Sequence, residues 1–337
     1  MNYHQPMISK LEVWDFILKN VQQSIPVVLL YVLESKGSSP GRQGFLMAVN
    51  AKAEMIGSIG GGIMEHKFVE MGKEMLKNIS QGIKIENGGA LRKQMHDKSA
   101  SRDQSGMICS GEQTIFIYQV QSQDVYSIEK IVQAIIEKKE AKLRLNKAGI
   151  EFVQEPAQHQ FHFQMNSEDD WSYEEKIGEQ PHIHIIGGGH CALALSKIMN
   201  MLGFFVHVYD DRPLLNTMQQ NHFADERKQL NSYNDLAMLL DNTKEDYVVI
   251  MTFGYRTDDM ALRAIINKPF KYLGLLGSKA KIEKMFNDCK AEGWTEEQLQ
   301  SIHAPVGLDI KSETPAEIAI SIAAEIIKLK NNADQDS

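Results

Sequence analysis

The sequence has few cysteines and no long apolar run. Its three cysteines, Cys109, Cys191 and Cys289, are widely separated, so they form neither a disulfide framework nor a CxxC metal site. No run of about 18 apolar residues is present, which excludes a membrane-spanning helix. Because the chain begins without a charged segment followed by an apolar one, we expect no export signal. These absences favour a protein of the reducing cytoplasm.

The sequence also lacks an excess of positive charge. Over 337 residues, 36 lysines and arginines stand against 44 aspartates and glutamates, which gives a net charge of -8. Proteins that bind nucleic acid through its phosphates present a basic face, so we expect no nucleic-acid partner. The sequence contains neither internal repeats nor the HExxH zinc motif. Its length is sufficient for two domains, each with its own core.

An apolar strand in the second half of the chain, ending at Ile186, runs into a glycine turn and then a helix. Gly187, Gly189 and Ala192 match the pattern G-x-G-x-x-G/A. In this pattern the first glycine permits a tight turn, the second lets a ligand approach the backbone, and the third residue lets helix and strand pack closely. The helix N-terminus at His190 offers unpaired N–H groups and a positive dipole end, which suit a phosphate. The motif predicts the first strand, turn and helix of a Rossmann-like unit.

The second strand of this unit is expected over Phe204–Asp210. Asp210 lies 23 residues after Gly187, near the position where a dinucleotide fold holds a ribose hydroxyl. Arg212 follows almost directly. The spacing strengthens the prediction of a nucleotide-binding fold.

Two more strands complete the expected sheet, over Tyr247–Phe253 and Lys271–Leu276. The last of them ends in Gly277, Ser278 and Lys279 at another strand-to-helix junction. Because parallel strands end at one edge of the sheet, this junction is a second candidate anion site beside the first.

The first half of the chain opens with an amphipathic helix, Met7–Gln23, and a buried strand, Pro26–Leu33. The loop that follows, Glu34–Gly44 (the hydroxyl-rich loop), is rich in glycine and small hydroxyls. Ser38, Ser39 and Arg42 in this loop are candidate donors to an anion. A plain surface turn is the alternative interpretation.

A second glycine turn, Gly60, Gly61 and Gly62, follows a returning strand at Phe45–Val49 and opens another helical run. The turn is suited to hold a polar ligand against bare backbone, with Glu65 placed to reach back to it. Tight packing, with Glu65 merely favourable at a helix N-terminus, accounts for the pattern equally well. Both interpretations stay open.

A polar segment, Gly88–Gly106, is expected to be a loop. Cys109 follows it, directly before Ser110 and Gly111. This cysteine is either a presented thiol or a small buried residue at the start of the strand expected over Gln113–Val120.

The whole chain therefore reads as an α/β protein with two domains. We expect an N-terminal α/β domain over residues 1–165, an acidic linker over 166–180, and a C-terminal Rossmann-like domain with a parallel sheet over 181–331. A capping box formed by Thr314 and Glu317 begins the closing helix.

Together these motifs resemble those of the XdhC/CoxI family, the xanthine dehydrogenase accessory proteins. The likeness covers almost the whole chain in order: residues 37–40, 57–62 with Glu65, Cys109, 187–190, 210–212, 274–279 and 314–319. Several motifs in one order are far more specific than any of them alone.

The resemblance implies a carrier that binds molybdenum cofactor (molybdopterin), protects it, supports its sulfuration and passes it to a molybdenum hydroxylase such as xanthine dehydrogenase. It also implies an N-terminal domain particular to the family joined to a Rossmann domain. On this analogy Cys109 contacts the cofactor or its transferable sulfur. A cysteine desulfurase and a second copy of the chain, in a homodimer, are further expected partners. The expected cofactor contacts are Ser38, Ser39, Arg42, Gly60, Gly61, Gly62, Glu65, Cys109, Gly187, Gly189, His190, Asp210, Arg212, Gly277, Ser278 and Lys279.

The sequence departs from the family pattern at three places. Ile63 stands where the family often has a cysteine after the triple glycine, and Ser110 stands where it has a glycine. Gly41 intervenes before Arg42, whereas in the family arginine commonly follows the Ser-Pro pair directly. The isoleucine excludes thiol chemistry at position 63.

Two other functions remain open at this point. Gly187, Gly189 and Asp210 also fit an NAD(P)-dependent oxidoreductase, so NAD(P) or another nucleotide is a second candidate cofactor. Such an enzyme needs an acid–base residue beside the nicotinamide, and His190 in the turn is more typical of a structural or ligand-orienting residue. The third function is a nucleotide-gated interaction module for a large enzyme. We expect a maturation factor without catalytic residues.

Overall fold

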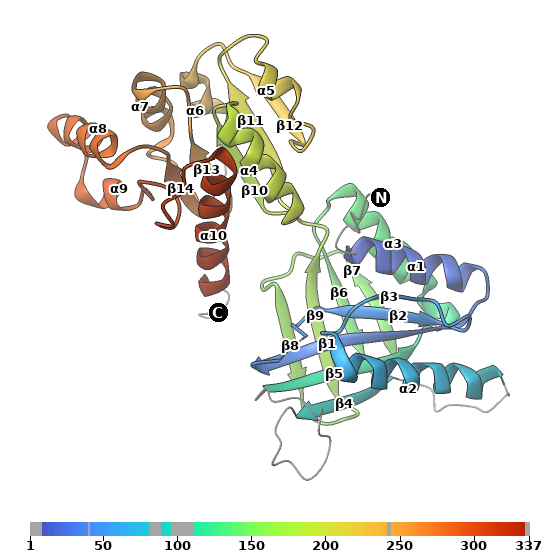
Figure 1. Cartoon of the computed structure of the whole chain (residues 1–337). Helices are drawn as coiled ribbons and strands as arrows, with labels where there is room; N and C mark the ends of the chain where they lie inside the picture. The colour runs from blue at the N-terminus through green and yellow to red at the C-terminus, as the bar shows by residue number, and fades with distance from the viewer. Residues whose placement is uncertain (1–8, 40, 81–88, 96–110, 241–243, 334–337) are drawn as a thin grey trace. The chain divides into compact units, whose positions relative to one another are not determined.

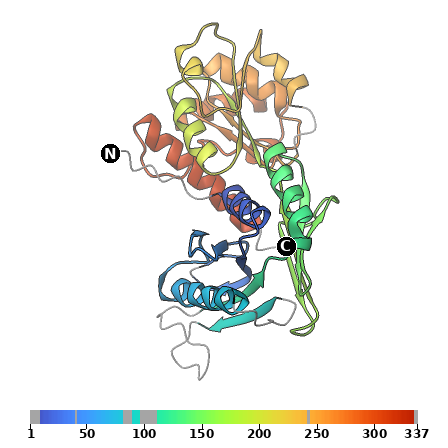
Figure 2. The ribbon, with the colours of Figure 1, turned by 90° about the vertical axis from the view of Figure 1, so that its right-hand side faces the viewer.

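The computed structural model describes residues 9–39, 41–80, 89–95, 111–240 and 244–333. The chain divides into two compact units, Met1–Glu179 (unit 1) and Gln180–Ser337 (unit 2). Figures 1 and 2 show the elements of both units from two directions. Within the described ranges, no helix is long and apolar enough to cross a bilayer.

Unit 1 contains an antiparallel sheet of order β3-β2-β1-β5-β4. Its strands are β1 (Val27–Gly37), β2 (Leu46–Asn50), β3 (Met55–Gly57), β4 (Ala90–Met95) and β5 (Gly111–Gln119). The continuous apolar run of β1 explains its central position, because strands buried on both faces carry apolar residues without alternation. Leu30 of β1 lies opposite Met47 on one side and Ile117 on the other.

The two faces of this sheet pack into separate cores. Val28 and Leu30 lie under α2 (Gly62–Ser80) in one core, and Figure 1 shows α2 running along the sheet. Leu29 and Tyr31 point to the other core. That second core is closed by α1 (Lys10–Gln22), α3 (Val125–Glu137) and a second sheet, and the short η1 (Ser122–Asp124) leads into α3.

The second sheet of unit 1 has the order β7-β6-β9-β8. Its strands are β6 (Ala141–Asn146), β7 (Gly149–Val153), β8 (Phe161–Met165) and β9 (Trp171–Ile177). The expected linker over 166–180 therefore needs correction, because β9 lies in it and pairs with both β6 and β8. Its residues alternate between buried and half-exposed, which is the pattern of a strand covered on one face. The division between the units falls after Glu179.

The expected loop over Gly88–Gly106 also needs correction. Residues Ala90–Met95 form β4, which pairs with β5 at the edge of the first sheet. Arg92 and Lys93 give this strand its polar composition, and charged side chains are common on edge strands because they discourage pairing with other chains.

Unit 2 contains a parallel sheet of order β12-β11-β10-β13-β14. Its strands are β10 (His182–Ile186), β11 (Phe205–Asp210), β12 (Glu226–Gln229), β13 (Tyr247–Ile250) and β14 (Tyr272–Leu275). Numbered within the unit, this is the strand order 3-2-1-4-5 of a Rossmann fold, which confirms the expected fold class. The order reverses between β10 and β13.

Helices cover both faces of the parallel sheet. One face packs against α4 (His190–Met201) and α10 (Pro315–Ala333). The other packs against η2 (Tyr233–Asp235), α6 (Leu236–Leu239), α7 (Tyr255–Ile265), α8 (Lys279–Ala291) and α9 (Glu296–Gln300), while the short α5 (Asn216–Gln219) follows β11. The capping box predicted for the closing helix is present, since Thr314 N donates to Glu317 Oε2 at 2.9 Å and Glu317 N donates to Thr314 Oγ1 at 3.3 Å.

Candidate functional site

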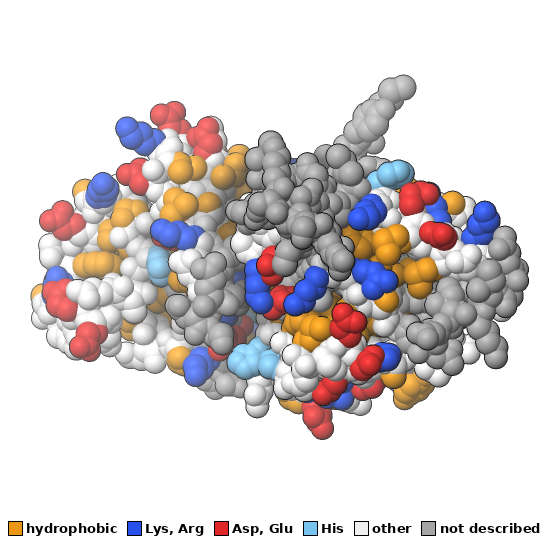
Figure 3. All heavy atoms as spheres, turned by 90° about the horizontal axis from the view of Figure 1, so that it is seen from below, with side chains coloured by type: hydrophobic (Ala, Val, Ile, Leu, Met, Phe, Trp, Pro, Cys, Tyr) orange, Lys and Arg blue, Asp and Glu red, His pale blue; other side chains and the backbone are white. Residues whose placement is uncertain are grey.

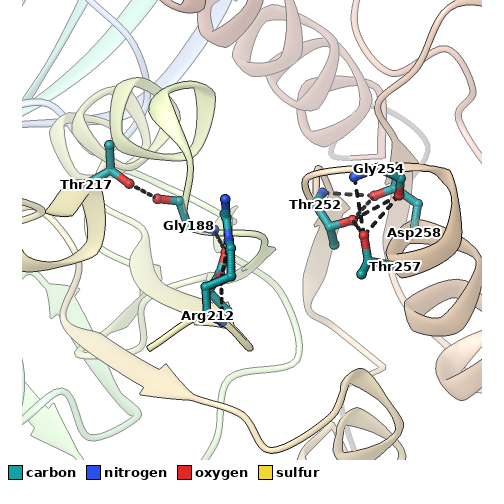
Figure 4. Close-up of polar contacts among 8 residues, drawn as sticks. Gly188, Arg212, Thr217, Thr252, Gly254, Thr257 and Asp258 are labelled. Carbon is teal, nitrogen blue, oxygen red and sulfur yellow. Dashed lines mark hydrogen bonds and ion pairs between the residues drawn. The ribbon is translucent and has the colours of Figure 1, made fainter. Parts of the chain in front are cut away.

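The carboxyl ends of β10 and β13 form the point where the strand order of unit 2 reverses. Open α/β sheets bind ligands in the crevice outside such strand ends. Figure 4 shows the polar groups there: Gly188, Arg212 and Thr217 on one side, and Thr252, Gly254, Thr257 and Asp258 on the other. The sequence motif around Gly187 is thus at the position where this fold binds ligands.

The first glycine of the turn is fixed by backbone geometry. Gly187 has a φ of +112°, and a Cβ there would lie 2.3 Å from the carbonyl oxygen of Met251, so no other residue fits. Its N–H donates to the carbonyl of Tyr209 at 2.7 Å. The turn is therefore tied to both neighbouring strands.

The N-terminus of α4 behind this turn is open. Gly189 is its N-cap with a φ of -75°, and a Cβ there would meet no atom within 4 Å. The first turn of α4 has no acidic residue, and His190 is exposed. None of the described side chains accepts a hydrogen bond from the backbone amides of residues 189–192. Free first-turn N–H groups and the positive dipole end suit an anion.

Asp210, in contrast, already has hydrogen-bond partners within the chain. Its carboxylate is fully buried and accepts from Gly188 N at 2.6 Å, Arg212 Nε at 2.9 Å and Arg212 Nη2 at 2.7 Å. Burial alone would raise the pKa of Asp210, but the hydrogen bonds from the Arg212 guanidinium and the Gly188 N–H hold that pKa below its ordinary value. The carboxylate fixes the glycine turn and does not face the crevice.

A second network fixes the end of β13. Thr252 donates from N and Oγ1 to Asp258 Oδ1 at 2.8 and 2.6 Å, and Gly254 N donates to Thr257 Oγ1 at 3.3 Å. Asp258 is fully buried and pairs with Lys281 of α8. The loop between β13 and α7 is therefore rigidly held.

The expected second anion site lies at the end of β14, next to β13 in the sheet. Ser278 is the N-cap of α8, and its Oγ accepts from Lys281 N at 3.3 Å. Gly277 is half-buried, while Ser278 and Lys279 are exposed. The Ser278 hydroxyl thus already serves the helix, and Lys279 offers an exposed positive charge at this edge.

In unit 1, the structure brings together two loops that the sequence singled out. Gln113, a buried residue of β5, donates from Nε2 to the carbonyl of Gly41 at 2.8 Å, and a Cβ on Gly41 would lie 2.0 Å from the carbonyl oxygen of Ile59. The hydroxyl-rich loop therefore packs directly against the glycine turn. Gln113 itself was missed from the sequence, where only its polarity within an apolar strand marked it.

The three candidate donors of the hydroxyl-rich loop differ in environment. Ser38 and Arg42 are exposed. Ser39 is only 6% exposed, and its hydroxyl has no hydrogen-bond partner in the described part of the chain. A buried hydroxyl without a partner is costly, so Ser39 is the candidate donor most in need of a ligand.

Glu65 reaches back to the glycine turn, and the groups that it contacts there belong to the chain itself. Its Oε2 accepts from Ser58 Oγ at 2.6 Å, Ile59 N at 3.0 Å and Gly61 N at 3.1 Å. Gly60 and Gly61 have φ values of +123° and +75°, which favour glycine. The carboxylate thus occupies the N-terminus of α2, which begins at Gly62.

Cys109 lies outside the described residues. Gly111, two residues later, is paired with Gly37, and a Cβ on Gly111 would lie 2.8 Å from the carbonyl oxygen of Ser38. The start of β5 therefore lies beside the hydroxyl-rich loop.

A cluster of histidines lies toward the amino ends of β10 and β11. His182 Nδ1 lies 3.0 Å from His207 Nε2, and His207 Nδ1 lies 3.0 Å from Glu226 Oε2. His184 lies 3.1 Å from the Tyr209 hydroxyl and 3.0 Å from Asp246, and its ring stacks on that of His207 at 4.4 Å. Burial, and next the neighbouring His184, lower the pKa of His207 to about 4. The cluster lines a pocket of about 220 Å³ and was not predicted as a site.

A second, larger pocket lies in unit 1. It measures about 420 Å³ and is lined by residues of both charges, including Lys142, Glu155, His159 and Glu174. Lys142 Nζ pairs with Glu174 at 3.3 Å. This pocket contains none of the residues that the sequence singled out, and its balanced charges favour no ligand class.

Two patterns of one protein family match the chain. The sequence pattern of the XdhC Rossmann domain matches residues 183–326, and that of the XdhC and CoxI family matches residues 21–84. The chain belongs to the XdhC/CoxI family. The family's Rossmann domain coincides with the parallel sheet of unit 2, and its second pattern covers the hydroxyl-rich loop and the Gly60 turn.

Three relatives of this XdhC/CoxI chain differ in length and name. The uncharacterised Escherichia coli protein YqeB is 26% identical over 318 residues, 93% of this chain and 45% of the relative. A Bacillus subtilis protein, named as a probable xanthine dehydrogenase subunit, is 28% identical over 158 residues, 46% of this chain and 45% of the relative. The aligned region thus covers about half the length of each of these two relatives. The Escherichia coli molybdenum cofactor insertion chaperone PaoD is 20% identical over 324 residues, 96% of this chain and 89% of the relative.

A solved structure has the same fold as this XdhC/CoxI chain. It is the crystal structure of a Bacillus halodurans protein described as a xanthine dehydrogenase, with a TM-score of 0.72 and 21% identity over 98% of both chains. At this identity the likeness supports the fold and carries nothing about activity.

Proposed function

We propose that this protein is an accessory factor that binds molybdenum cofactor, protects it, supports its sulfuration and delivers it to a molybdenum hydroxylase of the xanthine dehydrogenase type. The observation that carries the proposal is the open N-terminus of α4 behind Gly187 and Gly189, in a chain of the XdhC/CoxI family. The relative PaoD, named as a molybdenum cofactor insertion chaperone, supports the same role.

The groups of the chain suit such a ligand chemically. The cofactor presents a phosphate or dinucleotide, a polar pterin and a sulfur-bound metal. The free amides behind Gly189 suit the anionic group. The unpartnered hydroxyl of Ser39 and the exposed Arg42, with Ser38, Gly60, Gly61 and Gly62 beside them, are proposed polar contacts of unit 1.

The resemblance to the XdhC/CoxI family implies a role for Cys109 in sulfur chemistry, and the two described cysteines suit that role less well. Burial raises the pKa of the Cys191 thiol, and burial also raises that of Cys289. A raised pKa keeps a thiol protonated and unreactive. We therefore propose that Cys109 contacts the cofactor or its transferable sulfur, and that a cysteine desulfurase supplies that sulfur. A Cys109→Ser variant should bind cofactor yet fail to pass on sulfur.

The alternative of an NAD(P)-dependent oxidoreductase is supported less well. The ribose-binding role expected of Asp210 needs a carboxylate that faces the ligand, whereas Asp210 is fully buried and holds Gly188 and Arg212. Asp258, which follows β13, is also fully buried and paired with Lys281. Calorimetry with NAD and NADP together with a reduction screen tests this alternative, which predicts both binding and turnover.

The central test is anaerobic reconstitution of the apo-protein with molybdenum cofactor, followed by gel filtration. We expect retained molybdenum and the fluorescence of oxidised pterin in the protein peak, and activation of an apo-hydroxylase by the loaded protein. Retention no higher than that of an unrelated protein of similar size would reject the proposal. Sedimentation of the loaded and empty protein tests the proposed homodimer.

A further inference from the structure

Two side chains from different strand ends meet across the edge of the parallel sheet. Arg212 follows β11 and Phe253 follows β13, and these strands lie on either side of β10. The guanidinium carbon of Arg212 lies 5.5 Å from the centre of the Phe253 ring. The contact therefore connects the two sides of the crevice that begins at Gly187.

Arg212 is held as a flat surface with little free charge. Its guanidinium donates from Nε and Nη2 to the buried carboxylate of Asp210 at 2.9 and 2.7 Å. Because Asp210 neutralises it, Arg212 is a weak site for a phosphate but a good planar partner, since guanidinium groups stack on aromatic rings.

Phe253 is presented to solvent by a rigid loop. Its side chain is 86% exposed, although the residues on both sides of it are fixed: Thr252 bonds to Asp258, and Gly254 N bonds to Thr257. A single exposed apolar residue is ordinary on a protein surface. A large aromatic ring held out by a fixed loop, beside a fixed guanidinium and next to an open anion site, is a preorganised recognition surface.

The contact between the two side chains leaves most of the ring free. A separation of 5.5 Å is close to the outer limit of about 6 Å for a cation–π contact. The ring is therefore available to a third planar group without loss of a tight contact.

We propose that Phe253, supported by Arg212, is the stacking surface for a planar nitrogen heterocycle of a phosphorylated ligand whose anionic group binds at the α4 N-terminus. The inference rests on the proposed function, because the same chemistry, a heterocycle that carries phosphate, belongs to molybdopterin and to an adenine nucleotide. It adds a residue that selects ligands by their ring, while the Gly189 turn recognises the anion.

The test compares ligands with and without a ring. Calorimetry with ADP and with pyrophosphate should show tighter binding of ADP by the wild-type protein. Phe253→Ala should weaken ADP binding about tenfold or more, as expected for the loss of one base–aromatic contact, and should leave pyrophosphate binding unchanged. Phe253→Trp should restore ADP binding, with quenching of the added tryptophan fluorescence. Met238→Ala, which removes another side chain of unit 2 that is 86% exposed, serves as the matched control and should bind both ligands normally.

The same variants are measured with molybdopterin, which separates the two sources of the ring. Binding of ADP that depends on Phe253, without retention of molybdopterin, supports the stacking surface and rejects the carrier function. Retention of molybdopterin by the wild type that Phe253→Ala does not change, with unchanged ADP binding, rejects the stacking surface and leaves the carrier function in place. A wild-type protein that binds neither ligand rejects both.

Discussion

The chain contains two triple-glycine turns that open a helix, and their surroundings differ. At α2, the carboxylate of Glu65 folds back and accepts from Ser58, Ile59 and Gly61. At α4, the first turn has no acidic residue, and Gly189 leaves open space. At α2 the carboxylate comes from the helix itself. At α4, the buried Asp210 accepts, among the amides of the turn, only from Gly188 N, and the amides of residues 189–192 have no side-chain acceptor among the described residues.

The difference shows that a glycine-rich turn before a helix does not by itself mark a ligand site. Both turns offer backbone N–H groups and a positive dipole end. The two turns differ in the hydrogen-bond acceptors of these N–H groups, because at α2 the acceptor is Glu65 of the same helix. The turn at α4 is the better anion site, and Glu65 is sufficiently explained by its role in the turn.

The sharpest test of this difference replaces glycines of the turn before α4. Gly187→Ala should lower the free energy of unfolding of unit 2 by about 3 kcal/mol or more, because a Cβ would lie 2.3 Å from a backbone oxygen at a φ of +112°. Gly189→Ala should change it by less than about 1 kcal/mol, yet weaken anion binding, because the methyl group enters the open space. Urea unfolding and calorimetry with pyrophosphate measure the two effects. Equal stability of the two variants would contradict the geometry.

Acidification should destabilise unit 2, which carries the open turn, more than unit 1. The pKa of His207 is lowered to about 4 by burial and by His184, whereas an unfolded histidine has a pKa of about 6.5. The unfolded state therefore takes up the proton first, and stability that is complete above about pH 6.5 is lost between about 6.5 and 4, by up to about 3 kcal/mol. His182, His184, Tyr209, Lys228, Glu226 and Asp246 are the titratable groups around it.

Hydrogen exchange read by mass spectrometry resolves this loss by unit. In unit 1, burial raises the pKa of Asp124, which contributes the opposite sign. The pKa values of Glu70, Glu137 and Glu174 are lowered, but these carboxyls lose stability only as the pH nears and passes their unfolded pKa of about 4.3. Unit 1 should therefore lose less stability than unit 2 between about pH 6.5 and 5. His207→Gln should flatten the pH dependence of unit 2, and the exposed His222→Gln should leave it unchanged. A pH dependence that survives in His207→Gln would exclude this histidine as its source.

Removal of the Glu65 carboxylate at the N-terminus of α2 should destabilise unit 1. Glu65→Ala leaves three donors without their acceptor, and we expect a loss of about 2 kcal/mol in the free energy of unfolding. Glu70→Ala on the same helix removes a surface ion pair with Lys73 and should cost much less than Glu65→Ala. Thermal and urea unfolding provide the comparison. Equal losses in both variants would mean that Glu65 does not stabilise the turn.

A carboxylate introduced into α4 at the position that corresponds to Glu65 in α2 should produce the smallest effect. Leu193 stands three residues after the start of α4, as Glu65 stands three residues after the start of α2. Leu193→Glu should weaken pyrophosphate binding about tenfold, or about 1.4 kcal/mol, because the new carboxylate competes for the same amides. Leu193→Gln controls for the change of shape and should bind nearly as the wild type does. Similar affinities in the two variants would show that the anion binds elsewhere.

Much of the fold could be predicted because its elements follow local rules. The apolar run of β1 and the motif at Gly187 specified their elements directly. Strand β9 was missed because its sequence is acidic, although Trp171 and Tyr173 alternate with outward polar residues. Glu175 interrupts the apolar pattern, yet it is buried and accepts from Tyr31 and Tyr173. Only tertiary contacts make a buried carboxylate acceptable there.

The candidate site was predicted in position but not in detail. The sequence placed Asp210 at a strand end, but it gave no sign that Arg212 folds back on it and closes it off from a ribose. The exposure of Phe253 and the link from Gln113 to Gly41 depend on which loops the fold brings together. Such contacts are long-range, so no local pattern specifies them.

The surface adds one observation about partners. On the face shown in Figure 3, acidic and basic side chains of the described residues are interspersed, without a broad region of one sign. The described residues of this one face therefore present no broad basic region of the kind that contacts nucleic-acid phosphates.

The central claim is that the open turn at α4 binds the anionic group of molybdenum cofactor. Its most direct test is the molybdenum and pterin retained after anaerobic reconstitution of the wild type and of Gly189→Ala, measured side by side with stability. We predict retention by the wild type and background levels in Gly189→Ala, with both proteins equally folded. Equal retention by a folded Gly189→Ala variant would contradict the claim.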